Sequence, residues 1–181
     1  NMGRGKTHVE GKTFSHEAQK TQEKTYYGTS RGFCQEVREV VTREGGILSR
    51  GPVVAVGHKD LTTKGGQYVS QKGSTVLAST EGDVSILSQT LTHETQEWRH
   101  RGSTNVRTTV PVTAKIGAGT DVLHAARGSV TKEGAQTVAG RTIAVAAEKL
   151  VEKPAYATRE AVDTQSKRKG FLGTSRSQVT T

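Results

Sequence analysis

The chain has 181 residues, with 26 Lys or Arg against 17 Asp or Glu, giving a formal net charge of +9 and a pI near 9.8. Only 31% of the residues are hydrophobic and 4% aromatic, which excludes a thick core of large side chains. The single cysteine, Cys34, excludes an internal disulfide, and no run approaches the roughly 20 apolar residues of a membrane-spanning helix. The composition fits either disorder or a thin β core filled by small aliphatic side chains, with abundant glycine turns.

The sequence is internally repetitive, with a period of roughly 70 residues. Residues 61–67 (LTTKGGQ) align with residues 130–136 (VTKEGAQ), and the string GTSR at 28–31 returns at 173–176. The repeat predicts three segments: residues 1–45 as the end of a preceding repeat, then 46–111 and 112–181 as two repeats. Each repeat has an aliphatic half followed by a charged half.

The first element in chain order is a charged tract, residues 8–28, which we interpret as the second half of the preceding repeat. The aliphatic half that follows, residues 46–87, contains short runs bounded by Gly or Asp, a pattern typical of strands. The midpoints of these runs lie seven or eight residues apart, at Val54, Leu61, Val69, Val76 and Val84. This spacing predicts a parallel β-solenoid in which three strands form one coil of roughly 20 to 24 residues.

The charged halves of the two repeats are residues 88–110 and 152–179, and residues 115–151 form the second aliphatic half. Polar tracts of this kind cannot fill an apolar interior. We therefore expect them to leave the solenoid as outward hairpins, loops or disordered excursions.

The order of these motifs carries a resemblance to a known family. Residues 51–61 (GPVVAVGHKDL), followed by 65–69 (GGQYV) and 82–86 (GDVSI), are similar to the repeats of bacterial filamentous hemagglutinins. Residues 166–173 (SKRKGFLG) resemble the segment that closes those repeats in contact-dependent growth inhibition exoproteins. The resemblance extends from about His16 to Arg176.

The resemblance implies a very large exoprotein that crosses the bacterial outer membrane through a dedicated two-partner transporter. It also implies that the repeats form a right-handed parallel β-helix, a filament on the cell surface that serves adhesion or presents a toxin to a neighbouring cell. The sequence has no recognisable amino-terminal secretion domain and no Val-Glu-Asn-Asn boundary before a toxin. We therefore assign it to the filament, with a cell-surface receptor or glycan as the expected partner.

The basic excess suggests candidate contacts with polyanions or a receptor. Trp98 could stack on a sugar or base, and the adjacent Arg99 and Arg101 could hold phosphate or sulfate. A second basic cluster consists of Lys167, Arg168 and Lys169. The alternative is that these cations keep an edge-rich β structure from self-association. The scarcity of aromatic residues argues against dedicated nucleic-acid recognition.

Residues that could carry catalysis are sparse, and we expect no enzyme, metal or cofactor. His16-Glu17 and His93-Glu94 begin a zinc-protease pattern, but Lys20 and Glu97 stand where the second His belongs. Asp60, Asp83 and Asp121 precede aliphatic strands in Gly-containing turns, where Asp commonly has a structural role. A polysaccharide-active enzyme using these carboxylates is the alternative function, and end-to-end self-association of coils is a further expectation.

Overall fold

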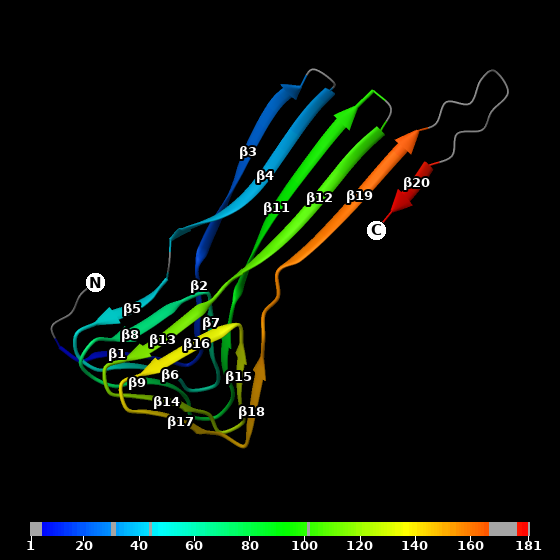
Figure 1. Cartoon of the computed structure of the whole chain (residues 1–181). Helices are drawn as coiled ribbons and strands as arrows, with labels where there is room; N and C mark the ends of the chain where they lie inside the picture. Colours follow the sequence, from blue (N-terminus) through cyan, green and yellow to red (C-terminus); the bar gives the residue numbers. More distant parts are fainter. Residues whose placement is uncertain (1–4, 30–31, 44, 101, 167–176, 181) are drawn as a thin grey trace, which may run out of the picture. The chain divides into compact units, whose positions relative to one another are not determined.

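The structure, a computed structural model, describes residues 5–29, 32–43, 45–100, 102–166 and 177–180. It is all-β, with no helix among these residues and 75% of them in strands, as Figure 1 shows for their arrangement. The prediction of an all-β fold with parallel sheets is therefore confirmed.

Contacts divide the chain into two compact units, each built from three separate stretches. Unit 1 contains Asn1–Gln19, Thr42–Gln89 and Pro111–Tyr156, and unit 2 contains Lys20–Val41, Thr90–Val110 and Ala157–Thr181. Both units therefore draw on all three of the segments predicted from the repeat.

Unit 1 consists of three parallel sheets. Sheet 1 has the order β1 (Thr7–Gly11), β6 (Val53–Gly57), β9 (Thr75–Ser79), β14 (Asp121–Ala125) and β17 (Thr142–Ala146). Sheet 2 has the order β18 (Lys149–Lys153), β15 (Ser129–Glu133), β10 (Val84–Leu87), β7 (Leu61–Lys64) and β2 (Phe14–Glu17). Sheet 3 has the order β16 (Ala135–Ala139), β13 (Ala114–Ala118), β8 (Gln67–Ser70) and β5 (Gly46–Ser49).

Successive strands of the chain visit the three sheets in turn. The path β5, β6, β7 runs through sheets 3, 1 and 2, and β8, β9, β10 repeats this circuit. Each strand pairs in parallel with its equivalent in the next circuit, as in β6 with β9, where Ala55 lies beside Leu77. Residues about 20 positions apart therefore stack on one another.

The interior of unit 1 is narrow and aliphatic. Side chains alternate between inside and outside along each strand, so that β6 and β9 both read buried, half-buried, buried. The core consists of one or two inward residues from each of the strands β6 to β10 and β13 to β15: Val53, Ala55, Leu61, Tyr68, Leu77, Val84, Ile86, Ala114, Ile116, Val122 and Val130. Small β-branched side chains fill this space well, which explains why few aromatic residues are needed.

Two tight corners connect sheet 2 directly to sheet 3. Gly65 links β7 to β8 and Gly134 links β15 to β16, with φ angles of +62° and +56°. This left-handed backbone region favours glycine because it has no Cβ. The two glycines occupy the same position in the sequence alignment of 61–67 with 130–136, so the repeat seen in the sequence is also a repeat of backbone geometry.

Unit 2 is a six-stranded antiparallel sheet made from the charged tracts. Its order is β20 (Ser177–Thr180), β19 (Thr158–Ser166), β12 (Gly102–Val112), β11 (Gln89–Arg99), β4 (Gly32–Arg43) and β3 (Gln19–Thr29). The charged tracts, which the sequence predicted as outward hairpins, loops or disordered excursions, form strands over their described residues, and these strands pair with one another through β4 with β11 and β12 with β19.

One hairpin occurs for every two circuits. The chain enters the antiparallel sheet after β2, β10 and β18, whereas β7 and β15 continue directly into sheet 3 through the glycine corners. Each repeat therefore adds two strands to each parallel sheet and two to the antiparallel sheet. Because neighbouring strands lie about 4.8 Å apart in both kinds of sheet, each sheet lengthens by roughly 9.6 Å per repeat.

Candidate functional site

Three aromatic rings from three neighbouring strands form a row on one face of the antiparallel sheet. Trp98 of β11 lies opposite Phe33 of β4, with ring centroids 5.4 Å apart, and Tyr26 of β3 stacks on Phe33 at 6.0 Å. The interplanar angles are 33° and 24°. Tyr26 is 56% exposed and Phe33 42%, so this aromatic row presents ring surface to solvent.

A row of amide side chains lies beside the aromatic row on the same face. Gln35 of β4 is directly opposite Gln96 of β11, each two residues from a ring of the aromatic row. Residues two apart in a strand share a face. Asn105 of β12 joins them, since its Nδ2 donates a hydrogen bond at 3.0 Å to Glu94 Oε1, also on this face of β11. We call Gln35, Gln96 and Asn105 the amide row.

Arg99 belongs to the opposite face of the sheet. It is adjacent to Trp98 in the strand, and alternation directs its side chain the other way. Its Nε and Nη2 donate to Glu97 Oε1 and Oε2 at 3.0 and 2.8 Å. This two-point ion pair raises the pKa of Arg99 and lowers that of Glu97. The sequence suggested that Trp98 and Arg99 contact one ligand together. Because their side chains lie on opposite faces of the sheet, the structure does not bring them together.

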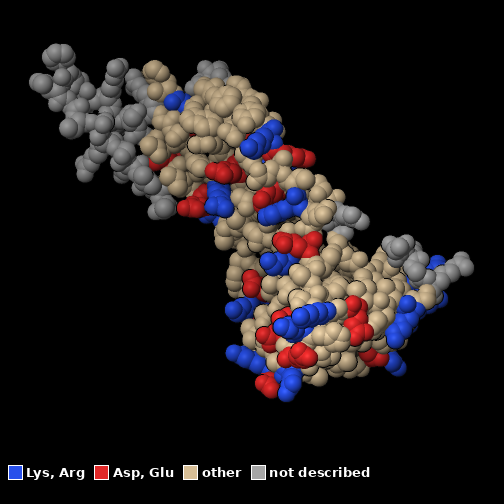
Figure 2. Space-filling model, turned by 180° about the vertical axis from the view of Figure 1, so that it is seen from behind, with Lys and Arg blue, Asp and Glu red and all other residues tan. Residues whose placement is uncertain are grey.

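The other predicted contact residues are Arg101, Lys167, Arg168 and Lys169, which lie outside the described residues. Figure 2 shows Lys and Arg interspersed with Asp and Glu on the face in view. Opposite charges also form salt bridges in the described part of the chain, as between Lys20 Nζ and Glu39 Oε1 at 3.2 Å. Mixed charge of this kind attracts polyanions less strongly than a patch of one sign.

Tyr27 is also exposed, and it lies on the face of the sheet opposite the aromatic row. It follows Tyr26 in β3, is 45% exposed, and forms a hydrogen bond with the Cys34 thiol that raises the pKa of the Tyr27 hydroxyl. Cys34 itself is buried, and it lies opposite Glu97 rather than beside the rings.

The three aspartates considered for catalysis connect neighbouring circuits of unit 1. Asp83 Oδ1 accepts hydrogen bonds from the backbone N and the Oγ of Ser129 at 2.6 and 2.9 Å. Asp60 Oδ1 accepts from the backbone N of Asp83 at 3.1 Å, and Asp121 Oδ2 from Arg141 Nη2 at 2.6 Å. All three carboxylates are thus engaged in bonds that hold the stacked turns.

Asp83 should make the stability of the protein depend on pH in the acid range. The Ser129 bonds lower the pKa of Asp83 below its ordinary value. Its stabilising effect is therefore complete above about pH 4 and is lost as the pH falls through the folded pKa. An Asp83→Asn variant should be less stable than the wild type at pH 7, and this difference should shrink in urea titrations as the pH falls through the lowered pKa of Asp83. A constant difference down to pH 2 would show that the Asp83 charge contributes nothing.

The two His-Glu pairs lie on strands and in different units. His16 in β2 makes an edge contact with buried Tyr68 at 6.0 Å, and His93 Nε2 lies 2.7 Å from Glu36 Oε1. Within the described residues, no group of three His, Cys, Asp or Glu side chains could hold a metal ion.

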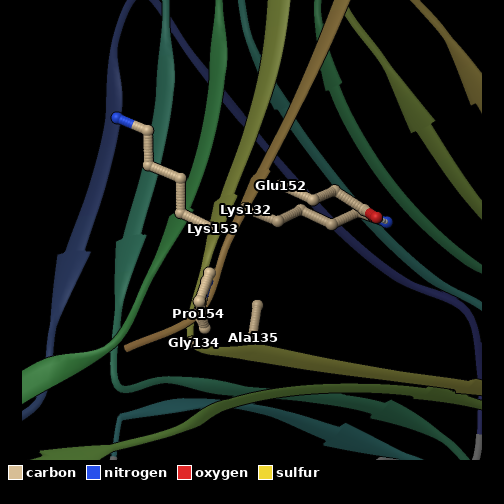
Figure 3. A pocket seen from close by; sticks show the side chains of 6 residues that line it. All are labelled: Lys132, Gly134, Ala135, Glu152, Lys153 and Pro154. Carbon is tan, nitrogen blue, oxygen red and sulfur yellow. Dashed lines mark hydrogen bonds and ion pairs between the residues drawn. The ribbon is translucent and has the colours of Figure 1, made fainter. Parts of the chain in front are cut away.

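An open pocket of about 310 Å³ lies beside the last circuit of unit 1. It is lined by Lys132, Gly134, Ala135, Glu152, Lys153 and Pro154 (Figure 3). Lys132 occupies an inward position of β15, next to buried Ile86 of β10. Its Nζ lies 3.0 Å from Glu152 Oε1, and the two side chains run side by side while Lys153 points away. The ion pair neutralises the charge that Lys132 would otherwise bring into the interior.

No helix in the described part of the chain is long and apolar enough to cross a membrane. Comparison with known protein families, with curated proteins and with solved structures finds no match. The resemblance to filamentous hemagglutinin repeats stays a prediction from the sequence motifs.

Proposed function

We propose that this chain is a non-catalytic repeat module of a large secreted bacterial surface exoprotein, acting in adhesion or in presenting a toxin to neighbouring cells. In this proposal the three parallel sheets are the sides of a right-handed β-solenoid. A two-partner transporter of the outer membrane would export the parent protein.

The observation that carries the proposal is that every repeat lengthens all four sheets by the same number of strands. Each repeat adds two strands to every sheet, because one hairpin follows every two circuits. Repeat architectures in which each unit contacts only its neighbours extend in one dimension. Such growth suits a filament. The hydrogen bonds of Asp60, Asp83 and Asp121 to neighbouring turns support a structural role for the three aspartates considered for catalysis.

Duplication of one repeat tests the architecture. We expect a chain with a second copy of residues 46–111 inserted before residue 112 to keep its β content in circular dichroism and the X-ray scattering profile of a folded chain, with each sheet longer by roughly 9.6 Å. An insert that increases the dimension as a flexible coil would contradict the proposal. Adhesion is tested separately, by measuring whether beads coated with the wild-type chain attach to bacterial or epithelial cells above an albumin control.

The last circuit of unit 1 should promote end-to-end association. Ile143 in β17 and Leu150 in β18 are both 47% exposed, whereas their neighbours in the preceding circuit, Val122 and Val130, are fully buried. Among the described residues, β17 and β18 are edge strands of sheets 1 and 2, so one side of each presents unpaired backbone groups. We expect concentration-dependent oligomers in light scattering, reduced by the double substitution Ile143→Lys and Leu150→Lys. A monodisperse monomer at high concentration would contradict this expectation.

A further inference from the structure

We propose that the outward face of sheet 1 packs against the same face of a second copy of this chain, with the two stacks of circuits side by side and running in the same direction. The contact is argued from unit 1 alone. Its biological role, the lateral pairing of filaments, rests on the function proposed above.

The outward face of sheet 1 is aliphatic over four consecutive strands. The side chains that alternate with the core residues point outward from β6, β9, β14 and β17. They form two rows across the strands. Row A consists of Val54, Val76, Leu123 and Ala144, and row B consists of Val56, Ala78, Ala125 and Ala146. Ala144 and Ala146 are exposed, and the other six are half-buried.

The outward face of sheet 2 has a different character. One of its rows carries hydroxyl groups, at Ser15, Thr62, Ser85 and Thr131. The other row carries mainly charges, at Glu17, Lys64, Leu87 and Glu133. Polar outward positions are thus compatible with these strands, so the aliphatic face of sheet 1 is not a requirement of the fold. A contiguous aliphatic patch of this kind indicates a contact surface.

A second copy of sheet 1 matches this surface in spacing and in side-chain size. The rows repeat about every 4.8 Å along the stack, and another parallel sheet has the same spacing. A two-fold axis along the stack places row A of one copy over row B of the other. Leu123 then lies over Ala125 of the second copy, and Val76 over Ala78 of the second copy. Large side chains therefore meet small ones, which allows the two faces to interdigitate.

The charges at the two margins of sheet 1 favour this parallel arrangement. Four cations lie just before the strands: Lys6, Arg50, Lys72 and Arg141, the last bound to Asp121. The turns after the strands carry four carboxylates and three cations: Asp60, Glu81, Asp83, Glu148, Lys12, Lys59 and Arg127. The parallel arrangement places the basic margin of one copy against the mixed margin of the other. An antiparallel arrangement would bring the two basic margins together, which costs energy.

The same symmetry pairs opposite charges on the strand that precedes the aliphatic rows. His8 and Glu10 of β1 lie beside Val54 and Val56, so they continue row A and row B. In the parallel arrangement His8 of one copy faces Glu10 of the other. All five strands of sheet 1 are therefore complementary to the second copy.

The contact in this chain is small and should be weak. Four strands about 4.8 Å apart, with about 13 Å of each strand, give roughly 250 Å² per copy, against roughly 800 Å² in a standard interface. Each repeat adds two strands to sheet 1. The chain with residues 46–111 duplicated should therefore associate more tightly than the original chain.

Charged substitutions at facing positions test both the contact and its direction. They are placed on a chain carrying Ile143→Lys and Leu150→Lys, which reduce end-to-end association. Sedimentation equilibrium up to about 1 mM should show a dimer of this chain. Val76→Lys alone and Ala78→Glu alone should each weaken the dimer by roughly tenfold or more, because each brings an unpaired charge into an apolar contact. An equal mixture of the two variants should restore most of the association, because position 76 of one copy faces position 78 of the other.

Ser85→Lys is the matched control, because it adds the same charge at an outward position of β10 in sheet 2. It should leave the dimer intact, and circular dichroism would establish that all variants are folded. The proposal is overturned if the chain stays monomeric even with the repeat duplicated, if Ser85→Lys weakens the dimer as much as Val76→Lys, or if the mixture stays dissociated. Rescue of Val76→Lys by Leu123→Glu instead of Ala78→Glu would also overturn it, since those positions face each other only in the antiparallel arrangement. None of these outcomes alters the β content or sheet lengthening expected from repeat duplication, so the two proposals fail independently.

Discussion

Replacing Leu77 with alanine should lower the free energy of unfolding by about 3 to 4 kcal/mol. Leu77 is fully buried in β9, and its neighbours along sheet 1 are Ala55 on one side and His124 on the other. The circuits are held in register by backbone bonds, so the interior has little freedom to collapse around the missing atoms. The loss should appear as a lower urea midpoint in circular dichroism.

Val76→Ala is the control for Leu77, since Val76 is the preceding residue and its side chain is only half-buried on the outer side of β9. It should cost less than about 1 kcal/mol. Equal costs for the two variants would show that the stacked aliphatic interior is not what stabilises the fold.

His124→Leu should remove a large part of the pH dependence of stability between pH 6.5 and 4. His124 is fully buried in β14, and neither ring nitrogen has a hydrogen-bond partner among the described residues. Burial, helped by the charge of Lys132 and opposed by Glu152, lowers the pKa of His124 to about 4. In this range the unfolded chain therefore binds a proton that the folded chain does not, and stability falls as the pH falls.

The expected loss in the wild type from this residue is on the order of 3 kcal/mol between pH 7 and pH 4. Urea titrations at a series of pH values would measure it, and His124→Leu should lack this component. The exposed His100→Gln variant should keep the steep dependence because it retains His124. Identical pH profiles for wild type and His124→Leu would contradict the assignment of His124 as a neutral interior side chain.

Much of the candidate site could not be predicted from the sequence. Trp98 stood out as the single tryptophan, but Tyr26 and Phe33 gave no signal that they share a surface with it. That surface depends on the pairing of β4 with β11, whose residues are more than 60 positions apart at the rings. The alternation of side chains along a strand would place the adjacent Arg99 on the other face, but the sequence left open whether this tract forms a hairpin, a loop or a disordered excursion.

The inward position of Lys132 was also missed. The alignment of residues 61–67 with 130–136 places Lys132 at the position of Thr63, which is fully buried in β7. The sequence therefore held the signal that this lysine belongs to the interior side of its strand. Its ion partner Glu152 belongs to the next circuit and could be identified only from the register of β15 with β18.

The sequence by itself determined the all-β character, the positions of the short strands and the separation into aliphatic and charged halves. These properties follow from local features: β-branched runs, turn glycines and a period that repeats along the chain. Only the tertiary structure decided that the charged tracts pair into one sheet, that Trp98 joins two distant rings, and that Arg99 is held on the other face. Those outcomes depend on the register between strands remote in sequence, and a one-residue shift in register would move every side chain to the opposite face.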